Sequence, residues 1–134
     1  MINNKNIFLI EDDINLLSGL QAKLRVEGFG VTADEGAEEN AVLEKILTLK
    51  PDYIILDIVL PKINGLELLK KIKAKPEISR IPIFVFTDIS DRDSRERARK
   101  YGADFYLIKT DFNLDEFINK FKKIIANKEK IGAI

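Results

Sequence analysis

The chain has 134 residues, the length of one domain, and 46% of them are hydrophobic, which is enough for a buried core. Twenty-two basic and twenty-two acidic side chains cancel, which argues against a general binder of nucleic acid or other polyanions. Cysteine and histidine are both absent, so the sequence excludes disulfides, thiolate chemistry, His-ligated zinc and a histidine general base.

The first predicted element is a buried strand at 7–10, after a polar start that lacks the composition of a signal peptide. No apolar stretch reaches the roughly 20 residues of a membrane span, so we expect a soluble cytoplasmic protein. The strand ends in three acids, Glu11, Asp12 and Asp13, and leucines recur at helical spacing over 16–24. Asp13 can cap that helix. Because adjacent carboxylates repel, a cap does not explain all three acids, and a cation or a partner is expected beside them.

A weaker strand at 29–33, expected near an edge of the sheet, leads into a helix predicted at 37–49. Helical spacing places Val42, Ile46 and Leu49 on the inner face of that helix. The chain has now repeated a strand–helix unit, and this repetition favours a parallel sheet.

The stretch 53–60 begins as an apolar run with β-branched residues, the composition of a strand buried on both faces. One carboxylate, Asp57, stands where that strand should end. Burial of an unpaired charge costs too much, so we expect Asp57 at the rim of the sheet. Pro61 cannot extend the strand, and Asn64-Gly65 indicates a turn into a helix. Open α/β folds commonly build their sites at such strand ends.

The rest of the chain continues the alternation of strands and helices. It predicts a helix after residue 65, a strand at 83–86, a charged helix at 92–100, a strand at 105–108 and a helix from about 114. Five strands alternating with five helices predict an α/β fold, a doubly wound parallel sheet with helices on both faces. We assign residues 1–126 to one domain and residues 127–134 to a frayed C-terminal tail.

Four of the predicted strands end in reactive or polar side chains: Glu11 and Asp12, Asp57, Thr87, and Lys109. In a parallel sheet these ends share one edge, so the side chains should converge. Carboxylate oxygens suit Mg²⁺, and a carboxylate can itself attack phosphorus. A lysine, a hydroxyl and a cation can offset the charge on a transferring phosphoryl group. The set is therefore suited to Mg²⁺-dependent phosphoryl transfer.

The chain resembles the receiver domain of two-component response regulators over residues 7 to about 125. The resemblance rests on four motifs: Ile10-Glu11-Asp12-Asp13, Leu56 to Pro61 with Asn64-Gly65, Phe86-Thr87, and Gly102 to Lys109. It implies the flavodoxin-like strand order 2-1-3-4-5. It also implies that Asp57 accepts a phosphoryl group from a histidine kinase or a histidine phosphotransfer protein.

The resemblance implies a magnesium site at the same acids. Asp12 and Asp57 would bind Mg²⁺ directly, Glu11 would act through water, and the backbone carbonyl of Val59 would complete the protein ligands. Asp13 aligns outside this set, so the helix cap remains its better interpretation.

The resemblance also assigns the groups that respond to phosphorylation. Thr87 would bind a phosphoryl oxygen, Lys109 would pair with the group, and Tyr106 would swing inward as Thr87 moves. Two residues depart from the family pattern. Thr110 stands where the family usually has proline, and Asp88 places a charge next to Thr87.

The expected protein is a stand-alone receiver that presents a switched surface to a separate downstream protein, without nucleic-acid binding or membrane insertion. It would be a signalling phosphoacceptor that assists its own phosphotransfer and slow autodephosphorylation, and not an enzyme. The apolar Val59 and Ile89 should keep the phosphorylated form long-lived, because they offer attacking water no hydrogen bond. The alternatives are a degenerate receiver that binds proteins without phosphorylation, a Mg²⁺-dependent phosphohydrolase and a flavin-binding module. The sequence names neither the kinase nor the output partner.

Overall fold

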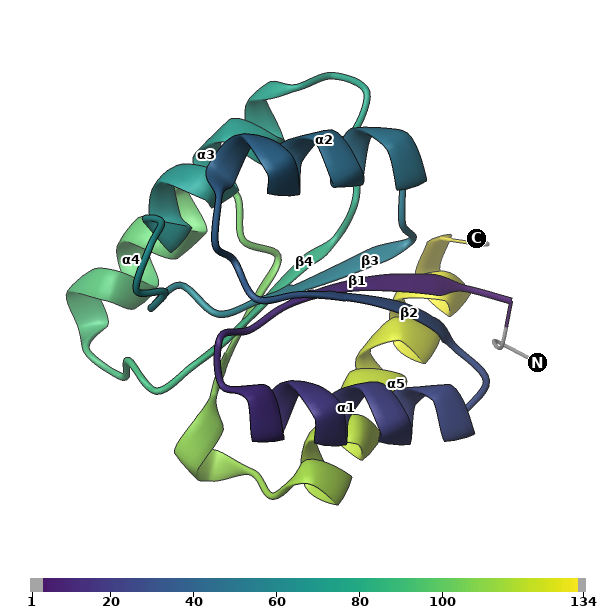
Figure 1. Ribbon diagram of the computed structural model, residues 1–134. Helices are drawn as coiled ribbons and strands as arrows, with labels where there is room; N and C mark the ends of the chain where they lie inside the picture. Colours follow the sequence, from purple (N-terminus) through teal and green to yellow (C-terminus); the bar gives the residue numbers. More distant parts are fainter. Residues whose placement is uncertain (1–3, 133–134) are drawn as a thin grey trace.

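One parallel sheet with helices on both faces makes up the computed structural model, which describes residues 4–132 and, for side chains, residues 4–127 (Figure 1). Its strands are β1 (Asn6–Ile10), β2 (Gly30–Asp34), β3 (Tyr53–Leu56), β4 (Ile83–Thr87) and β5 (Phe105–Ile108). Their order across the sheet is β2-β1-β3-β4-β5, which confirms the predicted order 2-1-3-4-5. β3 therefore lies at the centre, and β2 forms an edge as its weaker pattern indicated.

Two layers of helices cover the sheet. Figure 1 shows α1 (Ile14–Val26) and α5 (Leu114–Gly132) on one face, and α2 (Glu39–Leu49), α3 (Gly65–Ala74) and α4 (Arg92–Lys100) on the other. Successive strand residues point to opposite faces, so β1, β3, β4 and β5 each contribute to two hydrophobic clusters, whereas the edge strand β2 contributes to one. Central strands covered on both sides must be apolar at nearly every position, which explains the unbroken apolar runs of β1, β3 and β4.

The start of α3 fixes the loop that follows β3. The Asn64 side chain accepts hydrogen bonds from the backbone N–H groups of Leu66 and Glu67 and so caps the helix. Gly65 lies directly against this loop, because a Cβ at this position would be 2.3 Å from the Cα of Ile58. A glycine is therefore needed here for the helix and the loop to approach each other.

Two predicted helix boundaries differ from the structure. α2 begins at Glu39 because the Glu38 side chain accepts hydrogen bonds from two N–H groups of the first turn and caps the helix there. Leu49 is 50% exposed at the end of α2, so its predicted inward orientation is wrong, whereas Leu43 is buried. The backbone of α5 stays helical through Asn127 as far as Gly132, where a frayed tail was expected.

The extension of α5 follows from its sequence, because no proline or glycine interrupts residues 114–131. The last two residues, 133–134, lie outside the described part of the chain, and the domain boundary at 126 stays a prediction. Within residues 4–132, no helix combines the length and the hydrophobicity needed to cross a membrane.

Candidate functional site

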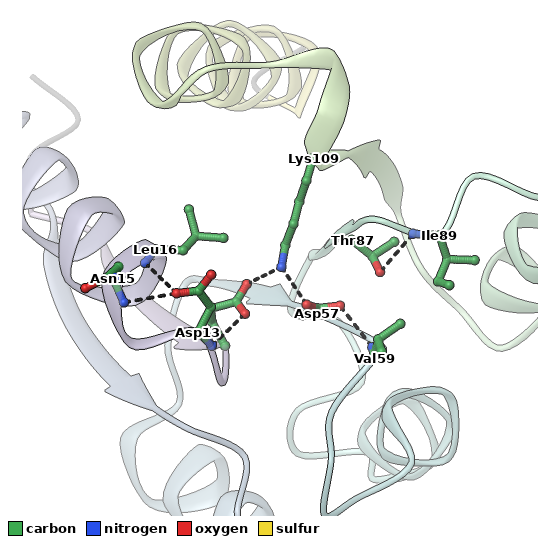
Figure 2. A network of polar contacts seen from close by, with 9 residues as sticks. Asp13, Asn15, Leu16, Asp57, Val59, Thr87, Ile89 and Lys109 are labelled. Carbon is green, nitrogen blue, oxygen red and sulfur yellow. Dashed lines mark hydrogen bonds and ion pairs between the residues drawn. The ribbon is translucent and has the colours of Figure 1, made fainter.

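The carboxyl ends of four neighbouring strands bring the predicted site residues to one edge of the sheet. Figure 2 shows three of them, Asp57, Thr87 and Lys109. Glu11 and Asp12 follow β1, Asp57 follows β3, Thr87 is the last residue of β4, and Lys109 follows β5. Because all the strands are parallel, their carboxyl ends lie at the same edge of the sheet. The predicted convergence of these side chains is therefore present.

Lys109 joins the two buried acids of this edge. Its Nζ lies 2.7 Å from Oδ2 of Asp57 and 2.7 Å from Oε1 of Glu11. Glu11 is only 2% exposed and Asp57 only 4%, so the ammonium compensates carboxylates that water reaches poorly. Figure 2 shows the lysine side chain extending from the end of β5 toward Asp57.

Burial and pairing shift two pKa values in this cluster. Desolvation raises the pKa of Glu11 above its usual value, although the hydrogen bond from Lys109 acts in the opposite direction. For Lys109, burial acts to lower the pKa, but hydrogen bonds to Asp57 and Glu11 and the charges of both acids outweigh it and raise the pKa. Lys109 is therefore a firmly protonated cation at neutral pH.

Backbone N–H groups orient the remaining carboxylate oxygens. Asp57 Oδ1 accepts a hydrogen bond from the N–H of Val59 at 2.9 Å, and Glu11 Oε2 accepts one from the N–H of Asp13 at 3.1 Å. The Asp13 side chain is turned to α1, where its Oδ1 accepts from the N–H groups of Asn15 and Leu16. Asp13 is thus the helix cap, and only its backbone belongs to the site.

Glu11, Asp12 and Asp57 form a cluster of carboxylates whose oxygen atoms lie within 4.8 Å of one another. Asp12 is the more exposed member, and the other two are buried. Hard oxygen donors with open access on one side fit Mg²⁺, which takes few protein ligands and keeps several waters. These three side chains would hold the ion, and a bound Mg²⁺ would neutralise charge on phosphoryl oxygens. The position of the Val59 carbonyl as a further ligand stays a prediction.

Thr87 and Tyr106 are linked through the backbone of Ile89. The N–H of Ile89 points to Oγ1 of Thr87 at 3.4 Å, and the Tyr106 hydroxyl donates to the Ile89 carbonyl at 2.7 Å. Burial raises the pKa of Tyr106, so its hydroxyl remains a donor at neutral pH. The predicted pair of switch residues is therefore connected by the β4–α4 loop.

Comparison with known families identifies this arrangement. Residues 7–122 match the family of response regulator receiver domains. The chain belongs to this family. The match spans the whole sheet and the acids, hydroxyl and lysine at its carboxyl edge, as the motifs predicted.

Known receiver domains agree in sequence and in structure. The response regulator ArlR of Staphylococcus aureus is 34% identical over 122 residues, which are 91% of this chain and 53% of ArlR. The chain thus spans about half the length of the curated relatives that it matches. A two-component response regulator from Clostridium difficile has a TM-score of 0.80 at 29% identity, covering 92% of this chain and 97% of that structure. A CheY-like receiver domain protein from Methanospirillum hungatei also has a TM-score of 0.80, at 26% identity and 94% and 97% coverage.

The departures from the receiver pattern leave the site geometry intact. Asp88 is exposed to solvent, while its neighbours Thr87 and Ile89 are buried and half-buried, respectively. Thr110 lies in a short 3₁₀ turn, Lys109–Asp111, and the peptide bond before it is trans. Lys109 reaches both acids from this turn.

Sequence reasoning missed two groups that contact the predicted switch residues. The backbone of Ile89 joins Thr87 to Tyr106, but any residue supplies a backbone N–H and C=O, so no side chain marks its role. Arg95 lies over the Tyr106 ring, and nothing distinguishes it in sequence from the other basic residues of α4.

Proposed function

We propose that this receiver domain accepts a phosphoryl group on Asp57 from a phosphohistidine of a histidine kinase or a histidine phosphotransfer protein, in a Mg²⁺-dependent reaction. The position of Asp57 carries the proposal. It is a buried carboxylate at the end of the central strand, oriented by Lys109 and by the Val59 N–H, with two further acids beside it.

The proposed transfer forms and breaks one bond each. An Asp57 oxygen attacks the phosphorus, the bond between phosphorus and the histidine nitrogen breaks, and an acyl phosphate remains on Asp57. The departing imidazole nitrogen keeps the electron pair and takes up a proton. Lys109 is placed to pair with the new phosphoryl group, and the Thr87 hydroxyl can donate to one of its oxygens.

The output of the reaction would be a change of surface. Movement of Thr87 toward the phosphoryl group would alter the Ile89 loop and Tyr106, and through them α4, which a downstream protein would recognise. The protein would thus act as a signalling phosphoacceptor with slow autodephosphorylation. Its stand-alone action, its cytoplasmic location and its lack of nucleic-acid binding stay predictions.

Labelling with a phosphodonor tests the proposal. Wild-type protein with Mg²⁺ and acetyl phosphate should gain one phosphoryl group by mass spectrometry, and the Asp57→Asn variant should gain none. Asp88→Asn is the matched control, because Asp88 is exposed beside the site and should be dispensable. Equal labelling of wild type and Asp57→Asn would refute the assignment. Absence of both labelling and beryllofluoride binding in wild type would instead favour the degenerate receiver.

A further inference from the structure

An arginine on the surface of α4 contacts the tyrosine that is linked to the site. The guanidinium carbon of Arg95 lies 5.4 Å from the centroid of the Tyr106 ring, within the range of a cation–π interaction. Arg95 is exposed on α4, whereas Tyr106 lies half-buried in β5. Arg95 therefore covers the outer side of a ring whose hydroxyl is bound to the Ile89 carbonyl.

The backbone of Ile89 connects this ring to Thr87. Its carbonyl accepts from the Tyr106 hydroxyl, and its N–H, in the preceding peptide group, points to Thr87 Oγ1, so the two hydrogen bonds hold the backbone on either side of the Ile89 Cα. A hydroxyl that accepts a hydrogen bond still has its own hydrogen to donate. The Thr87 hydrogen is then available for a phosphoryl oxygen, which the proposed function requires.

We propose that Arg95 is a positioning residue of this receiver, which holds Tyr106 against the Ile89 carbonyl and thereby keeps Thr87 oriented for the phosphoryl group. The inference rests on the proposed function for its consequence at Asp57, but the contact itself exists without phosphorylation. Arg95, an exposed side chain of α4, would thus influence how tightly the site at Asp57 binds a phosphoryl group or its analogue, although Arg95 does not belong to that site.

The general charge of α4 does not account for this contact. Five of the nine residues of α4 are arginine or lysine, and all five are exposed. Arg99, for example, pairs with Glu96 of the same helix at 3.6 Å, with both side chains largely in solvent. Asp91 caps the start of α4, because its side chain accepts a hydrogen bond from the N–H of Ser94. Arg95 therefore lies in a first helical turn that is held in place by this cap.

Four variants test the role: Arg95→Ala, Arg95→Lys, Tyr106→Leu and the matched control Arg99→Ala. Binding of beryllofluoride with Mg²⁺ is titrated, and the Tyr106 ring is followed by NMR of ¹³C-labelled tyrosine. We expect Arg95→Ala to weaken beryllofluoride binding about two- to fivefold, the range of one cation–π contact. Arg95→Lys should restore most of the affinity, because the cation remains over the ring. Arg99→Ala should behave as wild type.

A double-mutant cycle separates positioning from a general effect on α4. In a Tyr106→Leu background, Arg95→Ala should cause no further loss of beryllofluoride affinity, because the ring it acts through is gone. The same loss in both backgrounds, or no loss in either, would overturn the proposal. If wild type fails to bind beryllofluoride, the proposed function fails. In that case the contact is tested by the NMR signal of the Tyr106 ring in the protein without beryllofluoride. The same ring signal in Arg95→Ala as in wild type would refute the contact.

Discussion

Replacement of Lys109 by methionine should lower the free energy of unfolding, because the charges of the two buried acids are then no longer compensated. Methionine keeps an unbranched side chain but removes the ammonium that lies 2.7 Å from both Glu11 and Asp57. Both carboxylates are nearly inaccessible to water, so they would repel each other in a poorly solvated site. The Lys109→Met variant should therefore lose stability as well as phosphoryl acceptance.

Loss of one partner from a buried charge cluster typically costs about 3–5 kcal/mol, and we expect the free energy of unfolding to fall by this amount at pH 7.5. The pKa of Glu11 is already raised by burial, and without the lysine it should rise further. As pH falls toward 5.5, Glu11 of the folded variant takes up a proton before the unfolded chain does, which stabilises the folded state. The loss should therefore shrink at pH 5.5. Lys109 of the wild type stays charged over this range, because its raised pKa releases the proton only at more alkaline pH.

Urea unfolding followed by circular dichroism measures these changes, with and without Mg²⁺. A midpoint lower by about 2 M is expected at pH 7.5 for a slope near 2 kcal/mol/M. Added Mg²⁺ should recover more stability in the variant than in wild type, since the carboxylates are freed for the ion. Lys122→Met is the control, because Lys122 pairs with Glu27 at a partly exposed site, where water can solvate the remaining carboxylate, so the substitution should cost less than Lys109→Met. Equal losses at pH 5.5 and 7.5 would refute the reasoning.

Three further predictions address metal binding, phosphate lifetime and loop packing. Asp12→Ala should weaken Mg²⁺ affinity in a metal titration far more than Asp13→Ala, whose lost cap costs about 1 kcal/mol of stability, and the reverse order would move the site. The Val59→Asn, Ile89→Glu double variant should lose phosphate about tenfold faster than wild type, because it offers water hydrogen bonds. Equal rates would exclude the shielding argument. Gly65→Ala should destabilise by about 1–3 kcal/mol in urea unfolding, opposite to the usual helical gain, because its Cβ meets loop backbone at 2.3 Å. A gain in stability would contradict the close approach.

Short sequence patterns correctly predicted the strands and a helix cap, because these features depend on residues close together in the chain. The apolar runs before Glu11, Asp57, Thr87 and Lys109 predicted the four strands, because strands covered on both faces exclude polar residues. Their alternation with helices then required parallel pairing, which places all strand ends at one edge. The cap at Asp13 was predicted for the same reason, since a cap acts within three residues of its own position, and Asn64-Gly65 indicated the turn at which Asn64 caps α3.

Whether a residue at the end of a helix is buried depends on its neighbours in the folded structure, which the local sequence does not determine. Leu49 has the correct helical spacing for the core, but it lies on the last turn of α2 with solvent around half of its surface. Helical periodicity gives the direction of a side chain and not the extent of the layer that covers it. The helix of residues 114–132 likewise continues into the stretch from residue 127 onward where a frayed tail was expected.

The sequence by itself determined the α/β fold and the residue types that meet at the edge of the sheet, because both follow from periodicity and from the geometry of parallel strands. Only the tertiary structure decided how those groups pair. Lys109 lies between two acids distant in sequence, the Ile89 backbone joins Thr87 to Tyr106, and one exposed arginine of α4 covers the tyrosine ring. A long side chain has many rotamers of similar energy, and every residue carries the same backbone donor and acceptor. Neighbours from other elements select among them, and those neighbours exist only in the folded chain.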